Sequence, residues 1–230
     1  IGNYFFIGGI FAAISAILGG MIANYYGITI PFWVTLIVSF VALIFTLTLE
    51  EPEIHRTTGE VKYWDHIADT FKYLWRHPSL YHSIFLAVAL TVTLRLLDEY
   101  AQLYFFKVGV TLFSLGYLSA IAGVIESICS KFAYLLVRFK RKNIYLISLI
   151  ISIFGFLLMS YFHSAIGIIF VYFPIIATWM VEPLFNANLH RELPSSHRAT
   201  GESFVSLLRS MIVIPVAFGF SYLVDHYSIF

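Results

Sequence analysis

The stretch from residue 77 to residue 108 reads as one membrane-spanning helix that carries four polar side chains: Arg95, Asp98, Glu99 and Gln102. Their spacing of three and four residues places all four on one face of a helix. Charged groups inside the hydrocarbon of a membrane are costly unless they face water or a partner, so such a cluster predicts a functional site. Carboxylates can exchange protons or bind cations, and a guanidinium can bind an anion. We therefore expect this face to line a pathway for a solute through a membrane.

Two interpretations of this cluster stay open at the level of sequence. Arg95 could neutralise Asp98 or Glu99 along the helix, which would make the cluster structural and give it little net effect on stability. One guanidinium cannot fully compensate two carboxylates, however, and the surplus acid is suited to proton uptake. In that case Asp98 or Glu99 couples transport to protons or binds a cationic solute, and Arg95 contacts a solute anion or balances charge.

Two further charged residues lie deep in apolar segments. Glu126 is near the middle of the segment 111–136 and could line the same pathway. Arg209 is well inside the segment 200–223, where a cation needs a partner. The sequence offers three acidic candidates without choosing among them: Glu126, Glu182 and Glu202. We therefore assign Glu126 and Arg209 to the predicted substrate and proton pathway.

Glu202 and Arg198 lie four residues apart at the start of the last apolar segment. Opposite charges at this spacing face each other on a helix and stabilise it by roughly 0.2–0.5 kcal/mol. We expect this pair to be structural or to take part in gating.

The elements that position these residues are predicted from composition and hydropathy. Of the 230 residues, 60% are hydrophobic and 12% are charged, about half the charged share of an ordinary soluble domain. A membrane-spanning helix needs roughly 20 mainly apolar residues. Seven segments meet this requirement, at about 3–24, 30–49, 80–106, 111–136, 143–162, 165–187 and 200–223. We therefore expect an all-α polytopic membrane protein with seven transmembrane helices.

The segment 51–79 is the one substantial hydrophilic stretch of the chain. Its apolar residues recur at steps of three and four: Trp64, Ile67, Phe71, Leu74 and Trp75. That spacing is typical of an amphipathic helix that lies at a membrane interface. We expect a linker helix that packs on the cytoplasmic ends of the spans, with a separate binding role as the alternative.

Basic residues are concentrated in three of the connections between the predicted spans. They are Arg56, Lys62, Lys72 and Arg76 in the first, Arg138, Lys140, Arg141 and Lys142 in the second, and Arg191 and Arg198 in the third. The connections on the opposite side contain a single basic residue, Lys107. Because cytoplasmic loops carry an excess of Lys and Arg, we expect the linker and the basic loops to be cytoplasmic.

Several classes of function are disfavoured by what the sequence contains. The net charge of +1 gives no reason to expect a nucleic acid partner. Cys129 is the single cysteine and cannot form a disulfide within the chain. There is no dinucleotide-binding glycine fingerprint, phosphate-binding loop, HExxH pair or nucleophile elbow. We therefore expect no cofactor, no metal site and no enzymatic activity.

Three blocks of sequence together carry a family resemblance. The first contains Ser15-Ala16, Gly19-Gly20, Gly27, Pro31 and the stop Leu49-Glu50-Glu51-Pro52. The second contains Asp98-Glu99-Tyr100, Gln102, Tyr104, Phe105 and Gly109. The third and most specific contains Asn188, Leu193-Pro194, Arg198-Ala199-Thr200 and Ser203. The chain resembles the major facilitator superfamily of secondary transporters, although Ser15-Ala16 stands where the family's proton-antiporter motif has Gly-Pro.

The resemblance implies a major facilitator-like helical bundle with two six-helix halves joined by a cytoplasmic linker. Residues 1–50 then hold the last two spans of the first half, residues 51–79 the linker, and residues 80–230 five spans of the second half. The absent helices of the full-length chain would pack beside these seven.

The resemblance also implies a function and a location. We expect secondary active transport of a small solute by alternating access, coupled to protons, with import or efflux left open. The lipid bilayer, the solute and protons are the expected partners, and the plasma membrane, in a bacterium the inner membrane, is the expected location. A facilitative uniporter and a non-transporting receptor or scaffold are the alternatives.

Overall fold

The computed structural model describes residues 2–49, 63–162 and 164–227, and every regular element within these ranges is helical. The elements are α1 (Gly2–Tyr26), α2 (Thr29–Leu47), α3 (Tyr63–Arg76), α4 (Pro78–Lys107), α5 (Leu112–Phe132), η1 (Ala133–Arg138), α6 (Arg141–Tyr161), α7 (Gly167–Glu192), η2 (Ser195–His197) and α8 (Arg198–Tyr227). Within the described ranges, seven segments are long and apolar enough to cross a membrane: α1, α2, α4, α5 with η1, α6, α7 and α8. The all-α fold with seven membrane helices and one amphipathic helix is therefore confirmed.

Local sequence sets the ends of these helices. Gly27 has a φ of +93°, and its N–H donates to the carbonyl oxygen of Ala23 at 3.0 Å, which ends α1. Pro78 is the first residue of α4. Proline is tolerated there because an N–H group in the first turn would have no acceptor within the helix. Thr111 caps α5, because its hydroxyl oxygen accepts from the N–H of Ser114 at 3.3 Å.

The helices differ from the predicted spans mainly at three ends. α8 continues to Tyr227, beyond the predicted end at residue 223. α7 continues to Glu192, beyond the predicted end at residue 187, because Leu189 still faces the core and is fully buried. α5 ends at Phe132, and the chain continues as the 3₁₀ helix η1 as far as Arg138.

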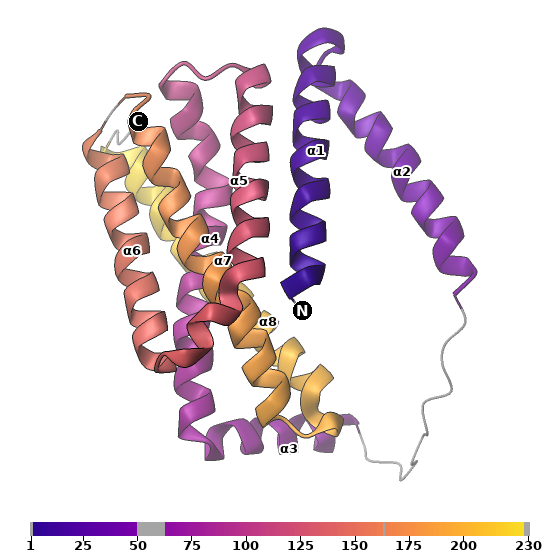
Figure 1. The fold of residues 1–230 in the computed structure, drawn as a ribbon, viewed down its shortest axis with the longest axis vertical. Helices are drawn as coiled ribbons and strands as arrows, with labels where there is room; N and C mark the ends of the chain where they lie inside the picture. The colour runs from indigo at the N-terminus through magenta and orange to yellow at the C-terminus, as the bar shows by residue number, and fades with distance from the viewer. Residues whose placement is uncertain (1, 50–62, 163, 228–230) are drawn as a thin grey trace.

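The core of the bundle lies between α4 and α7, with α6 and α8 packed beside them (Figure 1). Val88 and Leu90 of α4 meet Val181 and Phe185 of α7 in one fully buried cluster. This core fixes the rotation of α4 about its axis, and therefore fixes which of its faces stays outside the core.

α1 packs along α5 at very short range (Figure 1). A Cβ atom built on Gly20 would lie 2.9 Å from Cα of Gly116, and one built on Gly9 would lie 2.7 Å from the carbonyl oxygen of Gly123. The two backbones therefore touch at points where no side chain fits, which is the usual role of small residues between membrane helices.

α3 and α2 lie at the margins of the bundle (Figure 1). α3 runs across its lower end beneath α4 and α8. It is held there by Thr70, whose hydroxyl oxygen is 2.7 Å from Nδ1 of His197, and by Tyr73, which donates to the carbonyl oxygen of Glu192 at 3.0 Å. The side chain of Trp64 lies outside the described residues. α2 contacts α1 beside their connection and diverges from it along the rest of its length (Figure 1), and none of its residues is buried.

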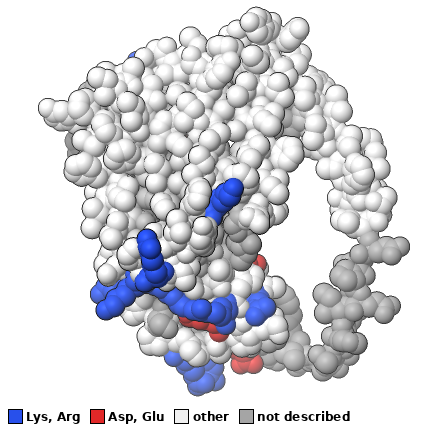
Figure 2. Space-filling model, viewed as in Figure 1, with Lys and Arg blue, Asp and Glu red and all other residues white. Residues whose placement is uncertain are grey.

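Basic side chains gather at the end of the bundle that carries α3, η1 and the connection from α7 to α8 (Figure 2). The described ones at this end are Lys72, Arg76, Arg138, Lys140, Arg141, Lys142, Arg191 and Arg198. Lys107 lies at the other end of α4, and Arg56 and Lys62 are outside the described residues. The three basic connections thus share one end of the molecule.

Candidate functional site

The first polar group lies on an exposed face of α4. Arg95 Nε is 3.6 Å from Glu99 Oε1, and these side chains are 63% and 58% exposed. Asp98 and Gln102 are exposed as well. Apolar residues beside and between them pack into the core against α5 and α7: Leu94, Leu97 and Ala101. Because lipid cannot solvate such charges, this face requires water or further protein beside it.

Glu126 of α5 joins this group. It is half-buried, and it interacts electrostatically with Asp98, which in turn interacts with Arg95 and Glu99. We call Arg95, Asp98, Glu99 and Glu126 the acid cluster. The cluster has three carboxylates and one guanidinium, and protonation of one carboxylate relieves the repulsion among them. The predicted roles of its members stay predictions.

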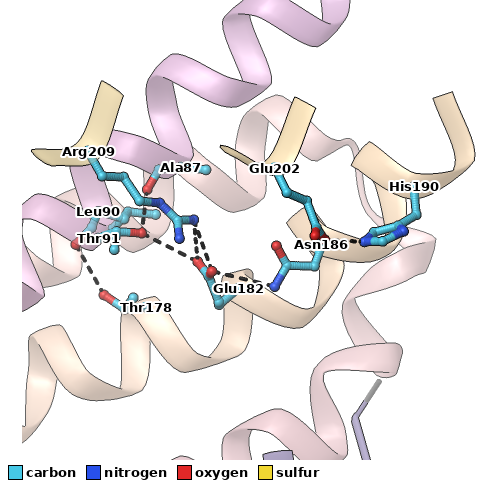
Figure 3. A network of polar contacts seen from close by, with 9 residues as sticks. All are labelled: Ala87, Leu90, Thr91, Thr178, Glu182, Asn186, His190, Glu202 and Arg209. Carbon is cyan, nitrogen blue, oxygen red and sulfur yellow. Dashed lines mark hydrogen bonds and ion pairs between the residues drawn. The ribbon is translucent and has the colours of Figure 1, made fainter. Parts of the chain in front are cut away.

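The second polar group joins α7 to α8 (Figure 3). Arg209 Nη2 lies 2.9 Å from Oε1 and 3.2 Å from Oε2 of Glu182. The two side chains are only 23% and 13% exposed. The Arg209 guanidinium also lies over the ring of Phe185, 5.8 Å from the ring centre. Of the three acidic partners that the sequence offered for Arg209, the structure selects Glu182.

Polar neighbours surround the Glu182 carboxylate (Figure 3). Asn186 Nδ2 donates to it at 3.5 Å, and Thr91 Oγ1 lies 3.4 Å from it. The single hydroxyl proton of Thr91 is shared with the nearer carbonyl oxygen of Ala87, at 2.9 Å. Arg209 Nε is buried and has no hydrogen-bond partner among the described residues. We call Glu182, Arg209, Asn186 and Thr91 the ion-pair network.

The ion-pair network was only partly visible in the sequence. The sequence offers Glu182 as one possible partner of Arg209 and does not single out Asn186 as a site residue. One sequence feature could have identified this site: Glu182 directly precedes Pro183 inside an apolar segment. A proline within a helix leaves a backbone carbonyl without its usual N–H partner, so an acid beside it marks an irregular, polar place in the helix.

A cavity of about 200 Å³ opens between α7 and α8 beside the network. Its polar lining residues are Glu182, Asn186, Glu202, Ser206 and Arg209. Since one water takes roughly 30 Å³ of liquid volume, the cavity has room for several water molecules that could solvate the ion pair.

In the structure, Glu202 and Arg198 contact other partners and not each other. Glu202 Oε1 lies 2.5 Å from His190 Nε2, and Arg198 Nε donates to the carbonyl oxygen of Leu193 at 3.3 Å. Glu202 faces α7 across the cavity, whereas Arg198, at the first residue of α8, turns back to the carbonyl that follows α7. Contacts between helices therefore displace the local pair; its gating role stays a prediction.

Within the described ranges, no group of three or more His, Cys, Asp or Glu residues could hold a metal ion. The site consists instead of ion pairs and carboxylates on helices that are apolar enough to span a membrane. This combination is that of an integral membrane protein with charged groups inside its spans.

Comparison with known families specifies the class. A sequence model of the Major Facilitator Superfamily matches residues 1–217, and the chain belongs to that family. Members of the family are membrane transporters rather than enzymes. No curated protein and no solved structure matches the chain.

Proposed function

We propose that this protein is a secondary active transporter that moves a small solute by alternating access and couples this movement to protons. One observation carries the proposal: α4 and α5 bring three carboxylates together with one guanidinium in their membrane-spanning parts. The acid cluster therefore has a charge surplus that protons or a cationic solute can balance.

The exposure of the α4 face supports a water-filled pathway. Arg95 and Glu99 are more than half exposed, although they lie in the interior of a 28-residue apolar span. A lipid-facing position would leave both charges in hydrocarbon. The face with Arg95, Asp98, Glu99 and Gln102 is therefore the wall of the solute and proton pathway.

The coupling step follows from the composition of the acid cluster. Asp98 and Glu126 sit on different helices and repel each other when both are ionised. A shift of α4 relative to α5 changes this repulsion, and with it the tendency of the pair to hold a proton. Alternating access supplies such a shift, because helices move as rigid units around a central site.

Arg209 belongs to the solute pathway in this proposal. Its guanidinium lines the polar cavity between α7 and α8, and its buried Nε has no acceptor among the described residues. Glu182 keeps the cation balanced when no solute is present. The gathering of basic residues at one end of the bundle supports placing that end in the cytoplasm. The plasma membrane stays the proposed location.

Proton movement in everted membrane vesicles tests the coupling. Vesicles with the full-length protein are energised to be acidic inside, a panel of small solutes is added, and dissipation of the proton gradient is recorded. The wild type should release protons with at least one solute. Asp98→Asn and Glu126→Gln should abolish solute-driven proton release while downhill movement of labelled solute continues.

Asp69→Asn is the matched control, since it neutralises an exposed carboxylate on α3, outside the acid cluster and the polar cavity. It should retain proton release. If the variants Asp98→Asn, Glu99→Gln and Glu126→Gln all leave concentrative transport and its pH dependence intact, the proposed coupling is wrong and facilitative uniport is favoured.

A further inference from the structure

We propose that the basic end of the bundle carries a binding site for the phosphate headgroup of an anionic lipid. A cavity of about 470 Å³ lies there between η1, α6 and α7. Three basic side chains line it: Lys140, Arg141 and Arg191. This cavity is separate from both the acid cluster and the ion-pair network.

Two of the three basic side chains at this cavity have no ion-pair partner among the residues that the structure describes. Arg141 pairs with Glu192 at the end of α7. Lys140 and Arg191 form no ion pair with any described residue. Two uncompensated cations thus face one cavity, and a phosphate group between them would form charge-assisted hydrogen bonds with both.

Neutral donors complete the polar wall. Tyr145 is 3% exposed, and it lines the cavity together with Asn188. The Tyr145 hydroxyl lies near the Asn188 side chain, but it forms no hydrogen bond of acceptable geometry within the described residues. An unpaired buried hydroxyl is unfavourable, and a phosphate oxygen is an acceptor that would satisfy it.

The remainder of the wall favours a lipid over a free anion. Val137, Ile144 and Leu184 give the cavity an apolar side, which an acyl chain can cover. Arg141 is the first residue of α6, and Arg191 lies in the last turn of α7, so the basic groups sit at the level where membrane helices end. Basic pockets at this level on the cytoplasmic side suit anionic lipid headgroups.

Native mass spectrometry of the full-length protein in a neutral detergent tests the site. Phosphatidylglycerol and phosphatidylcholine with the same acyl chains are titrated separately. The wild type should bind one molecule of phosphatidylglycerol with a lower dissociation constant than it shows for phosphatidylcholine. Because both basic side chains without an ion-pair partner are removed, Lys140→Gln with Arg191→Gln should raise the dissociation constant of phosphatidylglycerol at least tenfold.

Arg138→Gln with Lys142→Gln is the matched control. Like the test variant, it removes one lysine and one arginine from the basic end of the bundle, but at residues that do not line the cavity. Phosphatidylglycerol affinity should stay within about twofold of the wild type. Equal weakening by both double variants would mean general attraction to the surface and would overturn the proposal.

Two further measurements complete the test. One uses a conservative variant that should fold normally, and the other distinguishes a lipid headgroup from free phosphate. Tyr145→Phe keeps the charge and the ring, and it should weaken phosphatidylglycerol binding several-fold; unchanged binding contradicts the role of the hydroxyl and of the cavity. Inorganic phosphate at millimolar concentration should not displace the lipid. Complete displacement would show a site for free phosphate and would overturn the lipid assignment.

Discussion

The acid cluster and the ion-pair network hold charge inside membrane helices in opposite ways. In the network, one carboxylate meets one guanidinium at hydrogen-bonding distance, and both are largely buried. In the acid cluster, three carboxylates share one guanidinium, and the paired side chains are more than half exposed. The network balances its own charge, whereas the cluster must be balanced from outside by water, protons or solute. Stability should therefore depend on the network, and coupling on the cluster.

The largest effect on stability is expected from Glu182→Gln. This change leaves Arg209 as an uncompensated, mostly buried cation, so the free energy of unfolding should fall by about 3 kcal/mol. Equilibrium unfolding of the purified protein in mixed micelles measures the change.

The double variant Glu182→Gln with Arg209→Gln serves as the control for this prediction. It removes both charges, so it should be more stable than Glu182→Gln alone. A double variant as unstable as the single one would mean that the pair does not carry the stability of the network, and the contrast with the acid cluster would lose its basis.

The next largest effect is expected at the close contact between α1 and α5, which positions Glu126. Gly123 lies on α5 one turn before Glu126, and a Cβ atom there would lie 2.9 Å from the carbonyl oxygen of Gly9. Gly123→Ala should therefore push α1 and α5 apart and destabilise the protein by about 1–3 kcal/mol. It should also weaken solute-driven proton release, because α5 carries part of the acid cluster.

Gly8→Ala is the matched control for Gly123→Ala at the contact between α1 and α5. Nothing lies within 4 Å of a Cβ atom at Gly8, although the residue is adjacent to Gly9 in sequence. Alanine favours a helix over glycine by about 1 kcal/mol, so Gly8→Ala should leave stability unchanged or raise it. Destabilisation by both substitutions to the same extent would show that the close approach of the helices is not the cause.

The difference between Gly8 and Gly9 illustrates what sequence alone can predict here. The seven spans followed from the length of apolar segments, a local property, and they match the helices to within a few residues at most ends. Which glycine faces another helix depends on how α1 and α5 rotate against each other, and no local pattern contains that information. The same holds for Glu182, which packing alone distinguishes from Glu126 and Glu202 as the partner of Arg209.

The assignment of residues to the acid cluster was more accessible to sequence than the ion-pair network. Arg95, Asp98, Glu99 and Gln102 share one helix, so their common face follows from the helical repeat. Glu126 comes from another helix and joins them only through tertiary packing. The division into residues 1–50, 51–79 and 80–230 as parts of two halves stays a prediction.

A smaller effect on stability is expected within the acid cluster itself. Glu99→Gln removes an exposed ion pair with Arg95, and such pairs contribute only about 0.2–1 kcal/mol. The free energy of unfolding should therefore change by less than about 1 kcal/mol. The same unfolding assay checks this value. A loss as large as that for Glu182→Gln would place the acid cluster in the structural role assigned here to the network.

The smallest effect is expected for Glu202. Its side chain is half exposed, as in the acid cluster, yet it contacts another helix, as in the ion-pair network. A double-mutant cycle with Glu202→Gln and His190→Gln should give a coupling energy of about 0.5 kcal/mol. The parallel cycle with Arg198→Gln should give a value near zero, since the Arg198 guanidinium donates to the carbonyl oxygen of Leu193 instead. The reverse order of the two coupling energies would restore the local pair that the sequence predicted. It would also show that half-exposed charges at this end follow the helical repeat, whereas the buried pair between Glu182 and Arg209 follows packing.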